Sequence, residues 1–244
     1  MTALSSNLTA WFDQLDEHGF VILPAVFQVD EAAQMRCALE DALFRDHDGS
    51  TLRAEEGAVY GARNVLELWP AARDVWRQEP LPELLRAVLG PEYGLVRTLY
   101  FDKPPDRSWA LPWHKDLTIA VRDNRLPSKH FRKPTTKAGV PHVQAPRDLL
   151  ENMLTLRIHL DDVTDENGPL QVIPGSHRSD PTAAAVSIFV RRGDVLLMRP
   201  LLDHRSPSSH EGTTMHRRLL HLEFAGWPRL PDGYAWHDFV VGHV

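Results

Sequence analysis

The segment LPWHKDLTIA (111–120) contains His114 and Asp116 with a single residue between them. In an extended strand, residues i and i+2 project to the same side, so the imidazole and the carboxylate would be presented together. Two histidines and one carboxylate, with open coordination positions opposite, form the ligand set of redox-active non-haem Fe(II) sites. The pattern therefore predicts two iron ligands here and a third from a distant strand. A polar turn beside Trp113 is the alternative interpretation.

A second pair of the same spacing competes with the first. His159 and Asp161 lie in TLRIHLDD, where apolar side chains alternate along one face and the acids begin a turn. We interpret this pair as the end of a strand followed by a turn. The third ligand is expected from GDVLLMRPLLDHRSP, in which His204 follows an apolar strand that begins in a Gly-Asp turn. On position alone, a buried structural histidine at 204 is the alternative.

The segment HRRLLHLEF (216–224) supplies a candidate anion-binding arginine. Alternation with a period of two places Arg217, His221 and Glu223 on one face and Leu220, Leu222 and Phe224 on the other. An arginine held inside a barrel requires a buried anion, and its planar guanidinium suits a carboxylate. The adjacent Arg218 is a second candidate, and a surface salt bridge is the alternative role.

The elements that must position these residues fall into two parts. Residues 1–93 are expected to be mainly helical, with helices around 8–18, from an Asp30 cap to about 43, and over 81–90, and with a strand in GFVILPAVF (19–27). Residues 94–226 contain short strand-like runs bounded by Pro, Gly, Asn and Asp, at 95–103, 153–162, 170–176, 186–194, 195–200 and 217–226. Many short strands with turns between them are typical of an antiparallel sandwich or barrel. We therefore expect one mainly β domain over 1–244, with the N-terminal helices packed on one sheet.

Residues 121–150 interrupt this strand series without clear periodicity, which predicts a lid-like loop. The segment contains seven Lys and Arg residues and two Asp residues, so its formal charge is +5 in a chain of −6. One interpretation is a solvated, mobile loop. The other is a basic mouth that attracts an anionic substrate.

Composition narrows the class of protein. The 244 residues are 43% hydrophobic and 25% charged, as in ordinary globular proteins, and the modest acidic balance argues against nucleic acid or a membrane surface as partner. The single cysteine, Cys37, lies in a helical pattern and is expected to be a packed thiol. No signal peptide and no apolar run of about 20 residues is visible, so a cytoplasmic location is expected.

The order of these motifs resembles the phytanoyl-CoA dioxygenase family of Fe(II)- and 2-oxoglutarate-dependent oxygenases. In chain order, the motifs are His-x-Asp, the segment NGPLQVIPGSH, a Gly-Asp turn followed by an apolar strand and a histidine, and Arg-Arg on a closing strand. The resemblance covers about 19–226, and LDDVTDENGPLQVIPGSHR is especially similar to the family. It implies a double-stranded β-helix, that is, a jelly-roll or cupin-like barrel with flanking helices.

The resemblance also implies roles for individual residues. His114, Asp116 and His204 match the iron ligands, and Arg217 matches the arginine that binds 2-oxoglutarate, with Arg218 as its neighbour. The carboxylate of Asp116 implies hydroxylation, because related halogenases lack a carboxylate at this position. The implied cofactors are Fe(II), 2-oxoglutarate as cosubstrate and O₂.

Six further residues are weaker candidates, each with an alternative as a packing or strand-edge residue. Thr155 and Arg97 are expected to contact the cosubstrate. Trp113, Arg157, His142 and Gln144 are expected near the substrate.

The sequence thus predicts a dioxygenase that hydroxylates a small, anionic organic molecule. One alternative is a jelly-roll enzyme that uses the same metal ligands without 2-oxoglutarate. Another is a non-catalytic barrel whose histidines are structural or bind a metal. The sequence does not predict the identity of the substrate or the oligomeric state.

Overall fold

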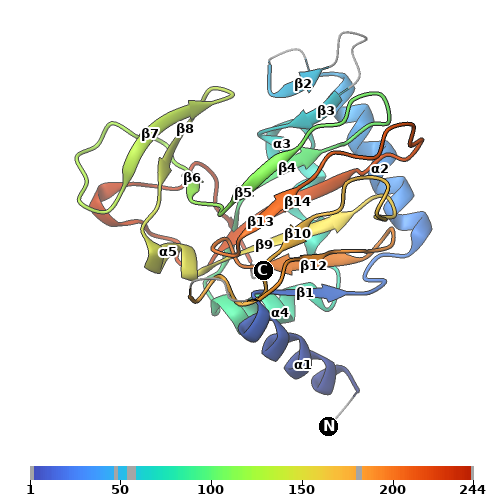
Figure 1. Cartoon of the computed structure of the whole chain (residues 1–244). Coiled ribbons are helices and arrows are strands. Elements are labelled where there is room, and N and C mark those ends of the chain that lie inside the picture. The colour runs from blue at the N-terminus through green and yellow to red at the C-terminus, as the bar shows by residue number, and fades with distance from the viewer. Residues whose placement is uncertain (1–2, 47–48, 54–58, 180–182, 243–244) are drawn as a thin grey trace.

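The computed structural model describes the chain except for residues 1–2, 47–48, 54–58, 180–182 and 243–244. Its largest element is an antiparallel sheet of eight strands (Figure 1). In spatial order the sheet contains β1 (Phe20–Leu23), β12 (Val195–Met198), β9 (Met153–His159), β14 (Leu219–Ala225), β4 (Gly94–Phe101), β3 (Val59–Ala62) and β2 (Thr51–Arg53), and β15 (Val240–Val241) also pairs with β4. Both edges of the sheet, β1 and β2, therefore come from the first third of the chain.

A smaller antiparallel sheet packs against the large one. Its order is β11 (Val186–Ser187), β10 (Gln171–Val172), β13 (His204–Ser206) and β5 (Leu111–His114). Apolar side chains lie between the two sheets, among them Leu196 and Met198 from β12 and Val172 from β10. This packing places β5 and β13 opposite the inner face of the large sheet.

Alternation along the central strands explains why the large sheet has one apolar face and one polar face. On β14 the even-numbered residues, Leu220, Leu222 and Phe224, belong to the main hydrophobic core. His221 and Glu223 project to the other side, toward the smaller sheet. Because successive side chains on a strand point to opposite faces, the same strand serves both the core and a polar interior.

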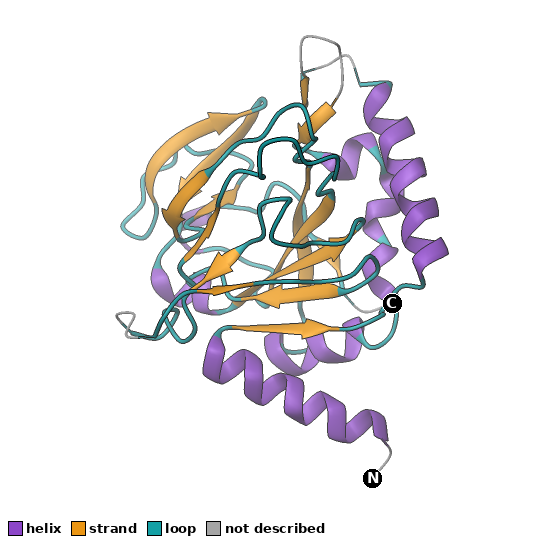
Figure 2. Cartoon of the chain, turned by 45° about the vertical axis from the view of Figure 1, so that its right-hand side comes forward, coloured by secondary structure: helices purple, strands orange, loops and turns teal. Residues whose placement is uncertain are grey.

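Helices cover the apolar face of the large sheet (Figure 2). They are α1 (Ala3–His18), α2 (Val29–Phe44), α3 (Val65–Leu68) and α4 (Leu81–Leu89). The short helix α5 (Arg147–Glu151) packs instead in a second apolar cluster with residues of the hairpin, and three short 3-10 turns lie at Pro70–Arg73, Val75–Arg77 and Pro231–Gly233. The core joins Leu15 of α1, Leu39 of α2 and Leu85 of α4 to the strands. In the described part of the chain, none of these helices is long and apolar enough to cross a membrane.

Two expectations about α2 are wrong. Cys37 is exposed, because the buried positions of the helix are 32, 39 and 43, and these place residue 37 on the solvent side. The helix also begins earlier than an Asp30 cap would require. Gln28 is the N-cap, and its backbone N–H donates to the Glu31 carboxylate at 2.7 Å, one half of a capping box.

The segment 121–150 is more regular than its sequence suggests. It contributes β7 (Arg132–Lys137) and β8 (Val140–Gln144), which form a three-stranded sheet with β6 (Thr118–Ala120) in the order β6-β8-β7. This hairpin projects beside the two larger sheets (Figure 1). Five of the six residues of β7 are exposed, and Lys137 is half-buried, so the strand carries no apolar alternation that could reveal it.

Candidate metal centre

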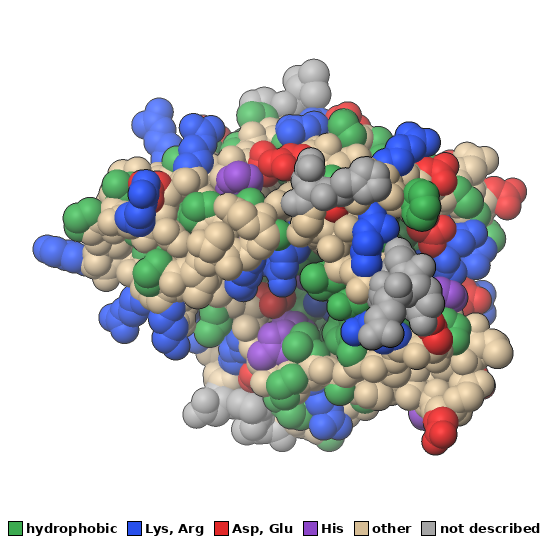
Figure 3. Space-filling view, turned by 90° about the horizontal axis from the view of Figure 1, so that it is seen from above, with side chains coloured by type: hydrophobic (Ala, Val, Ile, Leu, Met, Phe, Trp, Pro, Cys, Tyr) green, Lys and Arg blue, Asp and Glu red, His purple; other side chains and the backbone are tan. Residues whose placement is uncertain are grey.

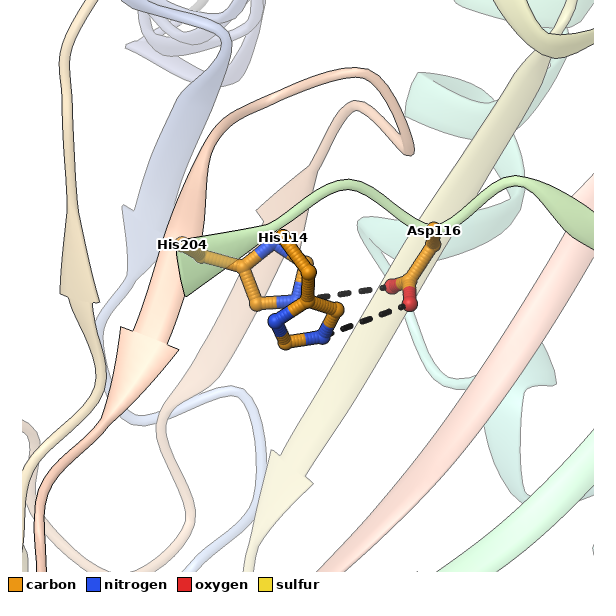
Figure 4. A group of neighbouring side chains, drawn as sticks. All are labelled: His114, Asp116 and His204. Atoms are coloured by element: carbon orange, nitrogen blue, oxygen red, sulfur yellow. Dashed lines mark ion pairs between the residues drawn. The ribbon is translucent and has the colours of Figure 1, made fainter. Parts of the chain in front are cut away.

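His114, Asp116 and His204 lie together between the two sheets (Figure 4). His114 ends β5, His204 begins β13, and the two are direct cross-strand partners in the antiparallel pairing. Asp116 follows β5, and its backbone N–H donates to the carbonyl of Pro200 at 2.9 Å. One potential ligand atom from each side chain lies within 4.8 Å of the others. The three predicted ligands are thus assembled from two segments of the chain.

The histidines are oriented as metal ligands require. Nδ1 of His114 lies 2.8 Å from the carbonyl of Pro112, and Nδ1 of His204 lies 2.9 Å from the carbonyl of Leu202. A carbonyl can only accept a hydrogen bond, so each Nδ1 carries the proton and each Nε2 keeps its lone pair. Hydrogen bonds of this kind fix the tautomer of metal-binding histidines. The Nε2 atoms lie 3.9 Å (His114) and 3.6 Å (His204) from carboxylate oxygens of Asp116.

The charge states also suit a divalent cation. Burial would raise the pKa of Asp116, but nearby His204, His221 and Arg157 outweigh it and hold the pKa at about 2. Burial lowers the pKa of His204 to about 4. At neutral pH the site therefore presents an anionic carboxylate and a neutral imidazole, the forms that bind metal. Oδ2 of Asp116 is buried without a hydrogen-bond partner in the described structure, so the donor set fits a metal ion.

A cavity of about 320 Å³ adjoins these residues. On this face of the molecule, Figure 3 shows a hollow with histidines and several Lys and Arg side chains around it. Besides the three candidate ligands, the lining contains five cations and a buried acid, which are Arg63, Arg97, Lys137, Arg157, Arg217 and Glu223. Apolar side chains, including Leu99, Phe101 and Trp109, complete the wall. The cavity is thus a mainly cationic chamber beside a candidate metal site.

Arg217 and Arg218 have different environments. Arg217 is buried in the cavity wall, and its Nη1 donates to the carbonyl of Gly168 at 2.8 Å, while its Nε has no partner in the described structure. Burial, reinforced by the charge of Arg157, lowers its pKa to about 9. Arg218 instead binds Asp161 with Nε at 2.7 Å and Glu40 with Nη1 at 2.7 Å. Arg217 is therefore the arginine that is free to bind an anion in the cavity.

Asp161 thereby has a structural role, as expected for the second His-x-Asp pair. Its partner in the sequence, His159, is buried, and neither ring nitrogen has a hydrogen-bond partner in the described structure. Burial lowers the pKa of His159 to about 3, so the ring is neutral.

A chain of polar contacts crosses the cavity wall from β9 to β4. Nε of Arg157 donates to Nδ1 of His221 at 3.2 Å, so Nε2 of His221 carries the proton and lies 3.2 Å from Oε1 of Glu223. Glu223 in turn forms a buried ion pair with Arg97. His142 continues the chain, because its Nδ1 lies 2.9 Å from the carbonyl of Val140 and its Nε2 accepts from Arg97 at 3.1 Å.

Of the weaker candidates, Arg97 and Arg157 line the cavity, whereas Trp113, Thr155, His142 and Gln144 are absent from its lining. Trp113 is 38% exposed, with the guanidinium of Arg205 4.9 Å from its ring centre. It projects away because it precedes His114 on the same strand. Thr155 is a buried cross-strand neighbour of Glu223, and Gln144 pairs with Thr118 on the hairpin sheet. His142 touches the site through Arg97.

Sequence reasoning missed two cations of this region. Arg63 lines the cavity from the segment between β3 and α3. Lys103 is fully buried beside the cavity, where its Nζ donates to Oγ of Ser206 at 2.8 Å and lies 4.7 Å from the ring centre of Trp109. Burial and the charge of Arg217 lower the pKa of Lys103 to about 7. A lysine two residues after the strand-like run 95–101 was the available signal.

The sequence model described as Phytanoyl-CoA dioxygenase (PhyH) matches residues 15–214. The chain belongs to the phytanoyl-CoA dioxygenase family. The match spans most of the chain and contains all three candidate metal ligands. Arg217 lies just beyond it.

Curated relatives of this chain are about 25% identical to it over the matched stretch. The ectoine dioxygenase of Sphingopyxis alaskensis is 25% identical over 181 residues, which cover 72% of this chain and 51% of the relative. The L-proline trans-4-hydroxylase of Streptomyces griseoviridis is 24% identical over 161 residues, which cover 66% and 52%. The matched stretch thus spans about half the length of these relatives.

Solved structures show the same fold. EctD from S. alaskensis with bound Fe superposes with a TM-score of 0.66 at 20% identity, covering 92% of this chain and 76% of EctD. The non-heme alpha ketoglutarate dependent epimerase SnoN from nogalamycin biosynthesis gives a TM-score of 0.66 at 17% identity, covering 94% and 87%. The antiparallel sheets with flanking helices are therefore an architecture that this chain shares with these two proteins.

Proposed function

We propose that this protein is a non-haem Fe(II)- and 2-oxoglutarate-dependent dioxygenase that hydroxylates a small, anionic organic substrate. The observation that carries the proposal is the convergence of His114, Asp116 and His204 beside a cationic cavity. Family membership and the ligand-bound structures of similar proteins support it. We also propose that the two facing sheets form a double-stranded β-helix and that the chain acts as one cytoplasmic domain, as the sequence predicts.

In this proposal the three ligands hold iron on one side and leave the cavity side open. When bound, iron and 2-oxoglutarate supply the oxidation of a C–H bond by O₂, with succinate and CO₂ as co-products. Asp116 would hold the iron through its carboxylate, which favours hydroxylation over halogenation.

The remaining residues bind and orient. Arg217 would pair with the far carboxylate of 2-oxoglutarate, since its buried guanidinium has no carboxylate partner within ion-pair distance among the described residues. The carbonyl of Gly168 holds the arginine in place at Nη1. Arg157, which is fixed by His221, lies beside the candidate metal site and would contact the bound organic molecules. The apolar wall formed by Leu99, Phe101 and Trp109 would exclude water from the reacting carbon.

An anaerobic titration tests this proposal. Purified apo-protein is titrated with Fe(II) and then with 2-oxoglutarate, while the visible metal-to-ligand charge-transfer band is followed. The band should appear in the wild type and in the control His130→Ala, whose ring is exposed and bonded to Asp232. It should be lost in His204→Ala. Metal binding without the band would favour a metalloenzyme that does not use 2-oxoglutarate, and absence of metal binding would contradict the proposal.

A further inference from the structure

Three cations gather at one end of the cavity, on three separate segments of the chain. Arg63 follows β3, Arg97 lies in β4, and Lys137 is the last residue of β7. Nζ of Lys137 donates to Oγ1 of Thr118 at 3.1 Å, which ties the hairpin to the segment that follows Asp116. We call Arg63, Arg97 and Lys137 the cation cluster.

The cation cluster carries more positive charge than its surroundings neutralise. Glu223 forms an ion pair with Arg97, whereas Arg63 and Lys137 form no ion pair with a carboxylate of the described residues. The three charges also act on one another. Burial first, and then the charge of Arg97, lowers the pKa of both Arg63 and Lys137. Three cations against one carboxylate leave a net charge of +2, which is favourable only if an anion joins them.

The cation cluster and Arg217 lie at opposite ends of the cavity. Arg97 is the cross-strand partner of Glu223 on β14. Arg217 precedes that strand, and at a rise of about 3.3 Å per residue the backbones of positions 217 and 223 are about 20 Å apart. His221 and Arg157 lie between them as cross-strand partners, and their charges act on Asp116. The candidate metal site is therefore placed between the two cationic ends.

We propose that the cation cluster binds an oxyanion of the substrate, a carboxylate or a phosphate, and so determines which carbon lies beside the metal. This inference rests on the proposed function, in which Arg217 holds the cosubstrate at the other end. The placement of Arg97 favours contact with the substrate over the cosubstrate contact expected from the sequence.

The location of the cation cluster refines the role of the basic segment 121–150. Lys129, Arg132 and Lys133 are exposed and do not line the cavity, whereas Lys137 is half-buried and does. Direct binding therefore depends on one lysine of the hairpin together with two arginines that precede it in the sequence. The exposed cations contribute a long-range field that salt screens.

The inference is tested by the binding of inorganic phosphate and of acetate to the apo-protein, measured by isothermal titration calorimetry at low ionic strength. The variants are Arg63→Gln, Lys137→Gln and their combination, with Arg132→Gln as a control that removes an exposed cation from the same strand. Arg217→Gln reports on the opposite end of the cavity. Circular dichroism and thermal melting show that each variant is folded, and the single variants test the proposal if the double variant unfolds.

We expect the double variant to bind the preferred oxyanion roughly tenfold to a hundredfold more weakly, because two charge-assisted contacts are lost. Arg132→Gln should bind it nearly as the wild type does. The loss caused by the double substitution should persist in an Arg217→Gln background, which lacks the proposed carboxylate site at the other end of the cavity. Three results would overturn the inference: binding that survives the double substitution in the Arg217→Gln background, an equal loss in Arg132→Gln, or no binding by the wild type at tens of millimolar of either anion.

The Fe(II) and 2-oxoglutarate titration on the same preparations separates this inference from the proposed function. If the wild type binds the oxyanion at the cation cluster but shows no charge-transfer band, the proposed function fails and the anion site stands. If the band forms but the anion does not bind, the inference alone fails.

Discussion

His114 and His204 face each other across β5 and β13, and each donates its Nδ1–H to the carbonyl two residues earlier in its own chain segment. The two rings are 4.2 Å apart, centre to centre. The same local hydrogen bond thus orients both imidazoles, although their strands are far apart in the sequence. Asp116 completes the group because its backbone is held by Pro200, shortly before His204 in the chain.

Divalent metal should stabilise the folded protein through these three residues. Metal at about one hundred times its dissociation constant adds about 2.7 kcal/mol to the free energy of unfolding, which for a domain of this size raises the Tm by roughly 5–10 °C. Thermal melting with and without Co(II), and after removal of metal by a chelator, measures the shift. The shift should vanish in His114→Ala and persist in His130→Ala. An equal shift in His114→Ala would place the metal elsewhere.

Substitution of Arg217 should affect the binding of 2-oxoglutarate, whereas substitution of Arg218 should affect the stability of the fold. Arg217→Gln should raise the KM for 2-oxoglutarate roughly tenfold to a hundredfold, since it removes a charge-assisted pair with a carboxylate. It should not weaken the fold, because the lost cation has no ion-pair partner in the described structure. Arg218→Gln should leave that KM nearly unchanged and lower the free energy of unfolding by about 3 kcal/mol, because the buried Asp161 loses its nearest cation and keeps only Arg192 at 3.8 Å. Steady-state kinetics and urea unfolding give both values. A raised KM in Arg218→Gln and a destabilised Arg217→Gln would assign cosubstrate binding to Arg218 instead.

Removal of Glu223 should destabilise the protein at neutral pH. Its ion pair with Arg97 is largely buried, with 7% and 12% of the two side chains exposed, so Glu223→Ala should cost about 3–5 kcal/mol. Burial would raise the pKa of Glu223, but Arg97 and His221 outweigh it and lower the pKa below its ordinary value of 4.5. The stabilisation is therefore complete above about pH 4.5 and is lost as the pH falls through the lower folded-state pKa. Urea unfolding between pH 3 and 8 tests this, and a penalty that did not shrink on acidification would contradict it.

His159 should make the folded protein sensitive to mild acid. Burial lowers its pKa from 6.5 to about 3, so the unfolded chain binds a proton that the folded chain does not. Stability should fall by about 1.4 kcal/mol for each pH unit below 6.5, until the pH reaches the folded-state pKa. His159→Leu should remove this contribution from the slope of unfolding free energy against pH, whereas the exposed His210→Ala should not. An unchanged slope in His159→Leu would show that the ring is charged in the folded state.

Local patterns indicated the candidate metal ligands but left alternatives open, and the resemblance to a known family made the choice. His-x-Asp on an extended segment depends only on strand alternation, and the antiparallel return of the chain brings His204 opposite. The same alternation placed Arg217, His221 and Glu223 on one face, and all three line the cavity. The choice between Arg217 and Arg218 required the structure, because it depends on Asp161 and Glu40 from other elements.

Tertiary contacts explain what the sequence did not reveal. Arg63 and Lys137 belong to segments far apart in the chain, and nothing in either segment signals that they share a cavity. The hairpin strand RKPTTK is almost entirely exposed, so it lacks the apolar alternation by which a strand is recognised. The packed thiol expected at Cys37 was wrong, and the place of Trp113 was not predicted, for a related reason: one residue alone does not show which face of a helix or strand it occupies.

The strand order has a consequence for synthesis of the protein. The two edges of the large sheet, β1 and β2, emerge from the ribosome early, whereas the central strand β14 emerges near the end. Until β14 pairs with β9 and β4, the strands on its two sides cannot form one continuous sheet. Pairing between strands that are distant in the sequence is slow, and it leaves strand edges exposed in the meantime. His221 and Glu223 lie on that strand, and Arg217 directly precedes it. A nascent chain halted before Arg217 would therefore hold every candidate metal ligand and lack both the cosubstrate arginine and Glu223, the carboxylate that pairs with the cation cluster.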